Sequence, residues 1–449
     1  MPDPNAPVDS GSTAWLLACA VLVLLMTPGI AFFYAGMVRR TNVLGVVMQG
    51  FAGLALVSVL WAAAGFSIAF GGDNRFIGDL RYAGIPYGAD NPIVPAVPLV
   101  AFALFQMMFA ALTASVILGA GAERWRFGAY LLFAGVWSLA VYAPVAHWVF
   151  DPRGWAARWG VLDFAGGTVV HINAGVAALA VAIVLGRRRG WPETVSRPHN
   201  LPLVMIGLAM LWFGWMGFNG GSAYGAGSLA ATAMLNTQVA AGTAVLAWIL
   251  AERLRYGKPT TLGAASGAVA GLVAITPAAG YVTALGAIAI GALAGLLCQM
   301  AVGLKRWFNV DDALDVAAVH IGGGLIGCVC VGLFASRTVN PNGADGLFFS
   351  GSYRLLGIQA GTAAIVAVYS LIATLLIAAV VNRVVGHRVR RRQEEMGLDL
   401  SQHGESAYDL APPDADAEPR PEPVPDPAVA TFANLSSEST GYIAGMPTR

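Results

Sequence analysis

The chain has 449 residues, of which 57% are hydrophobic and only 11% are charged, and its formal net charge at pH 7 is +1. Soluble domains carry about 25% charged residues, so this composition excludes an ordinary soluble protein and indicates a membrane protein. A nearly neutral chain also lacks the basic surface that nucleic-acid binding needs, and we expect no nucleic-acid partner.

Long apolar segments follow one another along most of the chain. Because a helix needs roughly 20 apolar residues to cross a bilayer, we expect an all-α polytopic protein with eleven membrane-spanning helices. The run 261–302 has no charged residue and is too long for one crossing at about 1.5 Å per residue, so a turn is expected at Thr276-Pro277-Ala278-Ala279-Gly280. The predicted spans are about 13–37, 43–70, 98–119, 127–149, 164–186, 201–219, 228–250, 261–277, 280–303, 314–335 and 354–382.

The positive charges between the spans predict the orientation. If the N-terminus lies outside, the connections on the inner side hold most of the loop Lys and Arg residues, and the C-terminal part from Arg383 onward adds more. Because cytoplasmic loops carry an excess of these residues, the sequence predicts an N-out, C-in protein. We expect residues 1–12 to be extracellular, 13–385 to form the membrane domain, 386–410 to be a charged cytoplasmic segment and 411–449 to be disordered.

Two histidines inside predicted spans stand out, His171 in Asp163-Phe-Ala-Gly-Gly-Thr-Val-Val-His171 and His320 in Asp315-Val-Ala-Ala-Val-His320. An ionisable side chain in hydrocarbon is costly and usually faces a bundle interior or a pathway. The alternative is two separate histidines, each bonded to a backbone or hydroxyl partner. Each follows an Asp in a different half of the chain, and a five-helix unit repeated once must reverse its topology, which predicts two inverted five-helix repeats plus one helix.

Other side chains point to no further chemistry. The four cysteines all lie in predicted spans, where we expect them to pack: Cys19, Cys298, Cys328 and Cys330. Stripes such as Gly263, Gly267 and Gly271 indicate close helix packing, within the chain or, as the alternative, between subunits. The chain lacks a nucleotide-binding loop, a nucleophile constellation and metal-ligand spacing, so we expect no enzyme activity, no metal and no cofactor.

Several motifs occur in the order found in one known family. The chain resembles the ammonium transporters of the Amt/Mep/Rh family, bacterial Amt type, over roughly residues 12–408. That resemblance implies an eleven-helix homotrimer with one pore per subunit in the cell membrane, carrying ammonium and methylammonium across the lipid bilayer. The motifs are Met-Thr-Pro-Gly at 26–29, Phe-Tyr-Ala-Gly-Met-Val-Arg at 33–39, the two histidine segments, Gly-Phe-Asn-Gly-Gly-Ser at 217–222, Asn-Pro-Asn-Gly-Ala-Asp-Gly-Leu at 340–347 and Gly-Leu-Asp-Leu-Ser-Gln-His-Gly-Glu-Ser-Ala-Tyr at 397–408.

The resemblance implies roles in the pore. His171 and His320 would share a hydrogen bond in its middle, Trp215 would flank it, and the rings of Phe109 and Phe218 would stack as a gate. Counting helix residues from the span ends leaves the two histidines roughly 10 Å apart in depth. They can meet only if the fifth span begins below the outer surface.

The resemblance also implies an outer site for capturing ammonium, made by Phe109, Phe150, Ser222 and Asp163. The family usually has Trp where this chain has Phe150, and Trp148 is an alternative ring. On their residue types alone, Asp163 could be a helix N-cap, Ser222 a cap of the next helix, and the phenylalanines ordinary core residues.

Two other functions keep the same fold, an ammonium sensor and an Rh-like ammonia gas channel. Sensors usually carry a fused signalling domain, whereas only about 65 residues follow the last predicted span here. Ser222 and its motif argue against the gas channel. The family's polar C-terminal segment, here 397–408, packs on the cytoplasmic face, couples subunits and works with a PII-type signalling protein.

Overall fold

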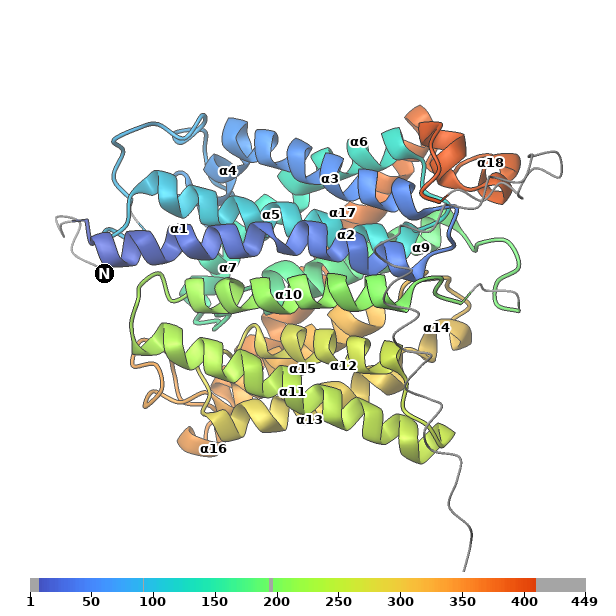
Figure 1. Cartoon of the computed structure of the whole chain (residues 1–449). Helices are drawn as coiled ribbons and strands as arrows, with labels where there is room; N and C mark the ends of the chain where they lie inside the picture. Colours follow the sequence, from blue (N-terminus) through green and yellow to red (C-terminus); the bar gives the residue numbers. More distant parts are fainter. Residues whose placement is uncertain (1–7, 92, 194–196, 409–449) are drawn as a thin grey trace, which may run out of the picture. The chain divides into compact units, whose positions relative to one another are not determined.

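The computed structural model describes residues 8–91, 93–193 and 197–408. Within these ranges the chain consists of helices and loops, with one isolated β-bridge between Trp125 and Arg388. The 411–449 tail, for which we expected disorder, lies outside the described residues. The helices lie side by side in one bundle, with Ser10 and α16 at one end and α14 and α18 at the other (Figure 1). We call these the N-terminal end and the α18 end.

The expectation of about eleven membrane helices is confirmed. In the described part, ten helices or runs of consecutive helices are long and apolar enough to cross a bilayer, and the shorter apolar α12 takes the place of the eighth predicted span. They are α1 (Ser10–Leu24) with α2 (Met26–Met37), α3 (Val43–Leu60) with η1 (Trp61–Gly65) and α4 (Phe66–Phe70), α5 (Leu99–Gly121), α6 (Phe127–Trp137) with η2 (Ser138–Tyr142) and α7 (Ala143–Phe150), η3 (Gly167–Ile172) with α9 (Asn173–Leu185), α10 (Leu201–Gly221), α11 (Ser228–Tyr256), α12 (Thr261–Ile275), α13 (Ala284–Ala301), α15 (Val316–Phe334) and α17 (Arg354–Val385).

Short helices connect or follow the spans. They are α8 (Trp155–Trp159), α14 (Leu304–Trp307), α16 (Leu347–Ser350), α18 (Arg391–Met396) and η4 (Asp399–His403). The turn predicted at 276–280 is present between α12 and α13. Three of the spans contain a π-helical turn, η1, η2 or η3, and π-turns inside helices are frequent at functional sites.

Small residues bring α11, α12 and α13 close together within the chain. A Cβ atom built on Gly291 of α13 would lie 2.4 Å from the carbonyl oxygen of Ala240 in α11. One built on Gly271 of α12 would lie 2.6 Å from the Cβ of Ala244. Any larger residue would push these helices apart, so the predicted close packing within the chain is confirmed.

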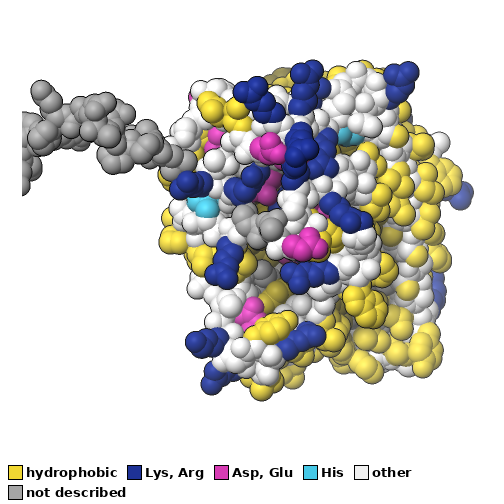
Figure 2. Space-filling view, turned by 90° about the vertical axis from the view of Figure 1, so that its right-hand side faces the viewer, with side chains coloured by type: hydrophobic (Ala, Val, Ile, Leu, Met, Phe, Trp, Pro, Cys, Tyr) yellow, Lys and Arg dark blue, Asp and Glu magenta, His cyan; other side chains and the backbone are white. Residues whose placement is uncertain are grey.

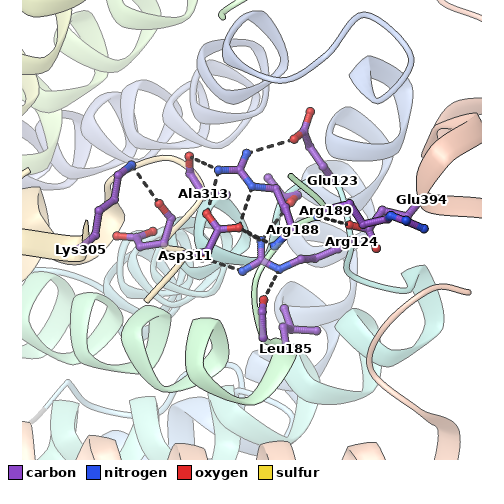
Figure 3. A network of polar contacts seen from close by, with 12 residues as sticks. Glu123, Arg124, Leu185, Arg188, Arg189, Lys305, Asp311, Ala313 and Glu394 are labelled. Atoms are coloured by element: carbon purple, nitrogen blue, oxygen red, sulfur yellow. Dashed lines mark hydrogen bonds and ion pairs between the residues drawn. The ribbon is translucent and has the colours of Figure 1, made fainter. Parts of the chain in front are cut away.

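Positive side chains gather at the α18 end, where Figure 2 shows Lys and Arg spread over the end face and hydrophobic side chains along the flank. A polar network lies beneath (Figure 3). Arg188, which follows α9, lies 3.0 Å from Glu123 and 2.8 Å from Asp311. Burial opposes the ionisation of Glu123, but Arg188 and Arg39 outweigh it and hold the pKa of that carboxyl below its usual value.

The C-terminal segment, residues 386–408, is part of this network. Glu394 of α18 accepts hydrogen bonds from the side chain of Arg388 and from the backbone N–H of Arg189 at 3.1 Å. Farther along, the Asp399 carboxylate accepts from the backbone N–H of Gly45 at the start of α3, at 2.8 Å. The segment therefore bonds to the ends of membrane helices that are far from it in sequence.

Candidate functional site

The two histidines of the sequence motifs meet in the interior of the bundle. His171 comes from η3 and His320 from α15, and both are buried. Their Nδ1 atoms are 3.2 Å apart, which is a hydrogen-bond distance. The alternative of two separate histidines is therefore wrong for this structure.

The difference in depth that the predicted spans give for the two histidines is absent from the structure, because helix α12 is short. The 15-residue helix α12 is only about 22 Å long, which leaves the turn after it inside the bundle. The segment before η3 docks on that turn, because the N–H of Phe164 donates to the carbonyl of Pro277 at 3.1 Å. A Cβ on Gly167 would lie only 2.5 Å from the Pro277 ring. The fifth span therefore begins at Gly167, three residues later than we predicted, and inside the bundle.

Hydrogen bonds around Thr276 fix the tautomers of the neutral pair. The Thr276 hydroxyl donates its proton to the carbonyl of Leu272 at 2.7 Å, so it can only accept from the indole of Trp215 at 2.9 Å and from His171 Nε2 at 3.3 Å. Neutral His171 then carries its hydrogen on Nε2, and its bare Nδ1 accepts from Nδ1–H of His320. The Nε2 of His320 is left as an acceptor.

Thr276 is a site residue that the sequence analysis missed, since it was expected only as part of a turn. The weak signal for it is a hydroxyl residue directly before Pro277 at the end of an apolar helix. Nothing in that pattern points to a histidine. Only the docking of η3 against the turn brings His171 to it.

A narrow, mostly apolar cavity of about 60 Å³ extends from the histidine pair toward Asp315. This volume holds only a few water-sized molecules, since each needs roughly 10–15 Å³. The lining includes His171, Trp215, His320, Met26, Ile30, Phe33, Leu211, Val269, Val316, Val319 and Asp315.

Two stacked phenylalanines lie next to His171. The ring centroids of Phe109 (α5) and Phe218 (α10) are 4.0 Å apart with an angle of 11° between the ring planes, and both side chains are buried. The Phe218 ring is 6.2 Å from that of His171, and the Trp215 ring stacks on His171 at 5.4 Å. A permeant molecule would have to move these rings to reach the imidazoles.

Ser222 lies at the C-terminal end of α10, one helical turn beyond Phe218. Its hydroxyl donates to the carbonyl of Phe218 at 2.9 Å, so its lone pairs can accept from a cation. The next long helix, α11, has Gly227 as its N-cap. The alternative in which Ser222 caps the following helix is therefore wrong.

Phe150 is the last residue of α7 and is partly buried beside the segment that precedes η3. A Cβ on Gly166 would lie 3.5 Å from the end of the Phe150 ring. Trp148 points elsewhere, because its indole donates to the carbonyl of Phe76 at 2.6 Å and its ring packs 4.7 Å from that of Tyr369. Trp148 is thus committed to other contacts and does not replace Phe150. Among the described residues, the aromatic rings that pack against the ring of Phe109 are those of Phe105 and Phe218.

Asp163 is a buried anchor for η3. One carboxylate oxygen accepts from the N–H groups of Gly166 and Gly167 at 2.8 and 2.7 Å, and the other from those of Thr168 and Val169 at 2.8 and 3.3 Å. The four backbone N–H groups occupy most of the acceptor sites of this carboxylate. They also stabilise its negative charge at the N-terminus of η3.

Asp315 differs from Asp163 although it also precedes a histidine helix. Its backbone is left-handed, at φ 61°, and its side chain pairs with Lys305 at 2.6 Å. Asp312 instead accepts from the N–H of Ala317 in the first turn of α15, at 2.7 Å. Burial, reinforced by the charge of Asp315, raises the pKa of Asp312 to about 6. Asp312, rather than the Asp315 side chain directly before α15, thus caps this helix.

Comparisons with known proteins agree with this geometry. Residues 14–408 match the model of the Ammonium Transporter Family. The chain is 50% identical over 434 residues to an ammonium transporter of Mycobacterium tuberculosis, covering 90% of this chain and 91% of that protein. The crystal structure of Candida albicans Mep2 superposes with a TM-score of 0.83 at 36% identity, covering 90% of this chain and 92% of that one.

A solved structure titled as a sensor Amt protein has the same fold. It superposes with a TM-score of 0.81 at 30% identity and covers 88% of this chain and 98% of its own. Fold alone therefore does not separate transporters from sensors. The family match spans nearly the whole membrane part of the chain and includes both histidine motifs, so this multi-pass membrane protein belongs to the ammonium transporter family.

Proposed function

We propose that this chain transports ammonium by capturing the cation at the N-terminal end, removing a proton and conducting ammonia past the His171–His320 pair. The observation that carries the proposal is the pair of touching imidazoles behind a stacked phenylalanine gate, next to a cavity that holds only a few water molecules. We place the N-terminal end outside, because Lys and Arg gather at the α18 end (Figure 2) and positive residues favour the cytoplasm.

Capture takes place in the outer cation site, which we define as Phe109, Phe150, Ser222 and Asp163. The Ser222 hydroxyl accepts a hydrogen bond from ammonium, and the faces of Phe109 and Phe150 attract the cation through their ring quadrupoles. Asp163 is saturated by backbone N–H groups, so we assign it an electrostatic and anchoring role. Its fixed negative charge favours a cation in the site without a direct bond.

Ammonium gives up its proton to solvent water near Asp163, before the gate, because a bare cation in a narrow apolar pore is heavily penalised while neutral ammonia is not. Ammonia then passes Phe109 and Phe218 and meets the imidazole edges, where the bare Nε2 of His320 accepts an ammonia hydrogen. Potassium has a similar size and charge but cannot lose a proton, so the same pore excludes it.

We propose further that the protein acts as a homotrimer, in which each pore lies within one subunit. Gate, histidine pair and cavity all come from a single chain, which supports that arrangement. The C-terminal segment 386–408 is the proposed regulatory element and the face for a PII-type protein, since it bonds to residues at the ends of α3 and α9. We assign no enzymatic step to the chain.

Ammonium-pulse currents in proteoliposomes test the transport mechanism, with potassium as the control ion. We expect an ammonium-dependent signal that disappears in His171→Ala and persists in His199→Ala, a histidine at the opposite end of α10 from the gate. An ammonium-specific current shows that the released proton also crosses the membrane. Wild-type uptake in His171→Ala would contradict the role of the pair. A change of internal pH without current indicates net ammonia conduction, and the absence of both signals favours the sensor function.

A further inference from the structure

A third intramembrane histidine has hydrogen bonds that differ from those of the pore pair. His147 of α7 is fully buried, and both of its ring nitrogens face backbone carbonyl oxygens. Nδ1 lies 2.8 Å from the oxygen of Ala69, and Nε2 lies 2.7 Å from that of Asn74. A carbonyl oxygen can only accept, whereas a neutral imidazole has one donor and one acceptor nitrogen. Both contacts are hydrogen bonds only if both ring nitrogens carry hydrogen.

His387 shows what a neutral buried histidine looks like in the same protein. Its Nδ1 accepts from the indole N–H of Trp125 at 3.2 Å, and its Nε2 faces the carbonyl of Ala378. One ring hydrogen satisfies both contacts. His171 is likewise satisfied by one, between His320 and Thr276. His147 has two acceptors in the corresponding places and therefore needs two hydrogens.

The charges around His147 match an imidazolium. A buried cation is tolerated when a counter-charge and hydrogen bonds accompany it. The carboxylate of Asp151, one helical turn along the chain, lies 3.8 Å from Nδ1 and is also fully buried. It holds Arg153 at 2.6 Å, and Arg153 in turn lies 3.6 Å from the exposed Asp73 of the facing loop. Asp73 also lies 3.8 Å from Arg81, which pairs with Asp79 at 3.0 Å. With His147 charged, the connected group has three cations and three carboxylates.

His147 belongs to a clamp at the N-terminal end between α7 and residues 69–76, which are the last two residues of α4 and the loop that follows it. The clamp is one-sided, because residues 69–76 contribute carbonyl oxygens and α7 with the residues after it contributes the donors. The other donors of the clamp keep their hydrogens at any ordinary pH. Only the second ring hydrogen of His147 depends on the protonation state of its side chain. These further bonds are Trp148 Nε1 to Phe76 O, Arg153 Nη2 to Phe70 O and Trp155 N to Arg75 O.

We propose that His147 is a positioning residue of the outer cation site, a buried imidazolium whose two N–H groups tie the last turn of α7 to the end of α4 and the loop after it. Phe150 is the last residue of that turn, three positions after His147. Holding this turn in place also holds the Phe150 ring beside Gly166. Less conformational entropy is then lost when the cation binds. The proposal rests on the proposed function only through the role of Phe150, and the protonation state can be measured separately.

Nuclear magnetic resonance of the wild-type protein tests the protonation state without any variant. The protein is labelled with ¹⁵N in its histidines and ¹³C in the carbonyls of its asparagines, and His147 is identified by the contact of Nε2 with the Asn74 carbonyl. We expect both ring nitrogens of that histidine to carry hydrogen at pH 7.5. A bare nitrogen in this ring overturns the proposal, and this outcome is independent of transport.

Uptake of labelled methylammonium tests the positioning role. In His147→Gln the amide N–H can reach one carbonyl while the amide oxygen faces the other. The turn loses one of the two bonds by which His147 ties it to residues 69–76, so we expect KM to rise by about threefold to tenfold while kcat stays within about twofold. His199→Gln, outside the clamp, should leave both constants unchanged. A fall in kcat with unchanged KM contradicts positioning of the capture site.

Discussion

Asp163 and Asp315 stand in equivalent places in the sequence, each a few residues before a pore histidine, yet their side chains make different contacts. The Asp163 carboxylate is buried and accepts from four backbone N–H groups at the start of η3. A quarter of the Asp315 side chain is exposed, and it forms an ion pair with Lys305. The same motif thus builds a fixed helix anchor at one end of the pore and a solvent-accessible ion pair at the other.

The difference extends to the two ends of the pore. At the outer end the groups around the path are aromatic rings, a hydroxyl and one saturated carboxylate. At the α18 end the cavity reaches Asp315, whose ion-pair partner is Lys305. The network of Arg188 and Glu123 lies at the same end. A pore that separates a cation from its proton needs low polarity near the gate, whereas the exit can be polar because it is open to water.

Matched substitutions of the two aspartates should show the largest difference. In Asp163→Asn one oxygen becomes an NH2 group that faces backbone N–H donors, so two charge-assisted bonds worth about 1.5–3 kcal/mol each are lost. We expect methylammonium uptake to fall by at least about tenfold, and Asp315→Asn to stay within about threefold because partly exposed ion pairs contribute about 0–1 kcal/mol. Equal losses, at equal amounts of folded protein, would show that the two aspartates do not differ in their importance for uptake.

Removal of the C-terminal segment tests whether the α18 end controls the pore. Deleting 397–449 removes the contact of Asp399 with Gly45 and that of Leu398 with Asn42. These two hydrogen bonds are worth about 1 kcal/mol each, so we expect uptake to fall by up to about thirtyfold or to lose its regulation. Deletion of 409–449 alone is the control and should leave uptake unchanged. If both truncations transport like the full chain, the segment has no regulatory role in uptake.

Much of this site can be predicted from local sequence. The remaining features depend on where the helices begin and end in the folded structure. Hydropathy alone placed His171 and His320 inside spans, and the order of motifs indicated that they belong to one pore. Sequence could not show that α12 is short enough to leave its turn inside the bundle, and so the importance of Thr276 was missed. The capping by Asp312 rather than Asp315 was also hidden, because it depends on the left-handed backbone at 315.

His147 shows the same limit in another form. The sequence gives a histidine in an apolar segment, and neither hydropathy nor motif order reveals that two carbonyls from residues 69 and 74 face its ring. Those carbonyls belong to a segment more than 70 residues away. A protonation state is thus a property of the folded contacts, even where the residue itself is evident in the sequence.

The smallest expected effect concerns the ring at the outer end. Phe150→Trp offers a larger ring face with a stronger cation–π interaction, worth about 0.5–1 kcal/mol more, so KM for methylammonium should fall by about twofold to fivefold with kcat unchanged. Phe150→Leu keeps an apolar side chain without a ring and should raise KM. If Trp and Leu gave the same KM, the ring at 150 would not contact the cation. Capture at the outer end would then depend on Ser222 and Phe109, and on the attraction of the cation by the negative charge of Asp163.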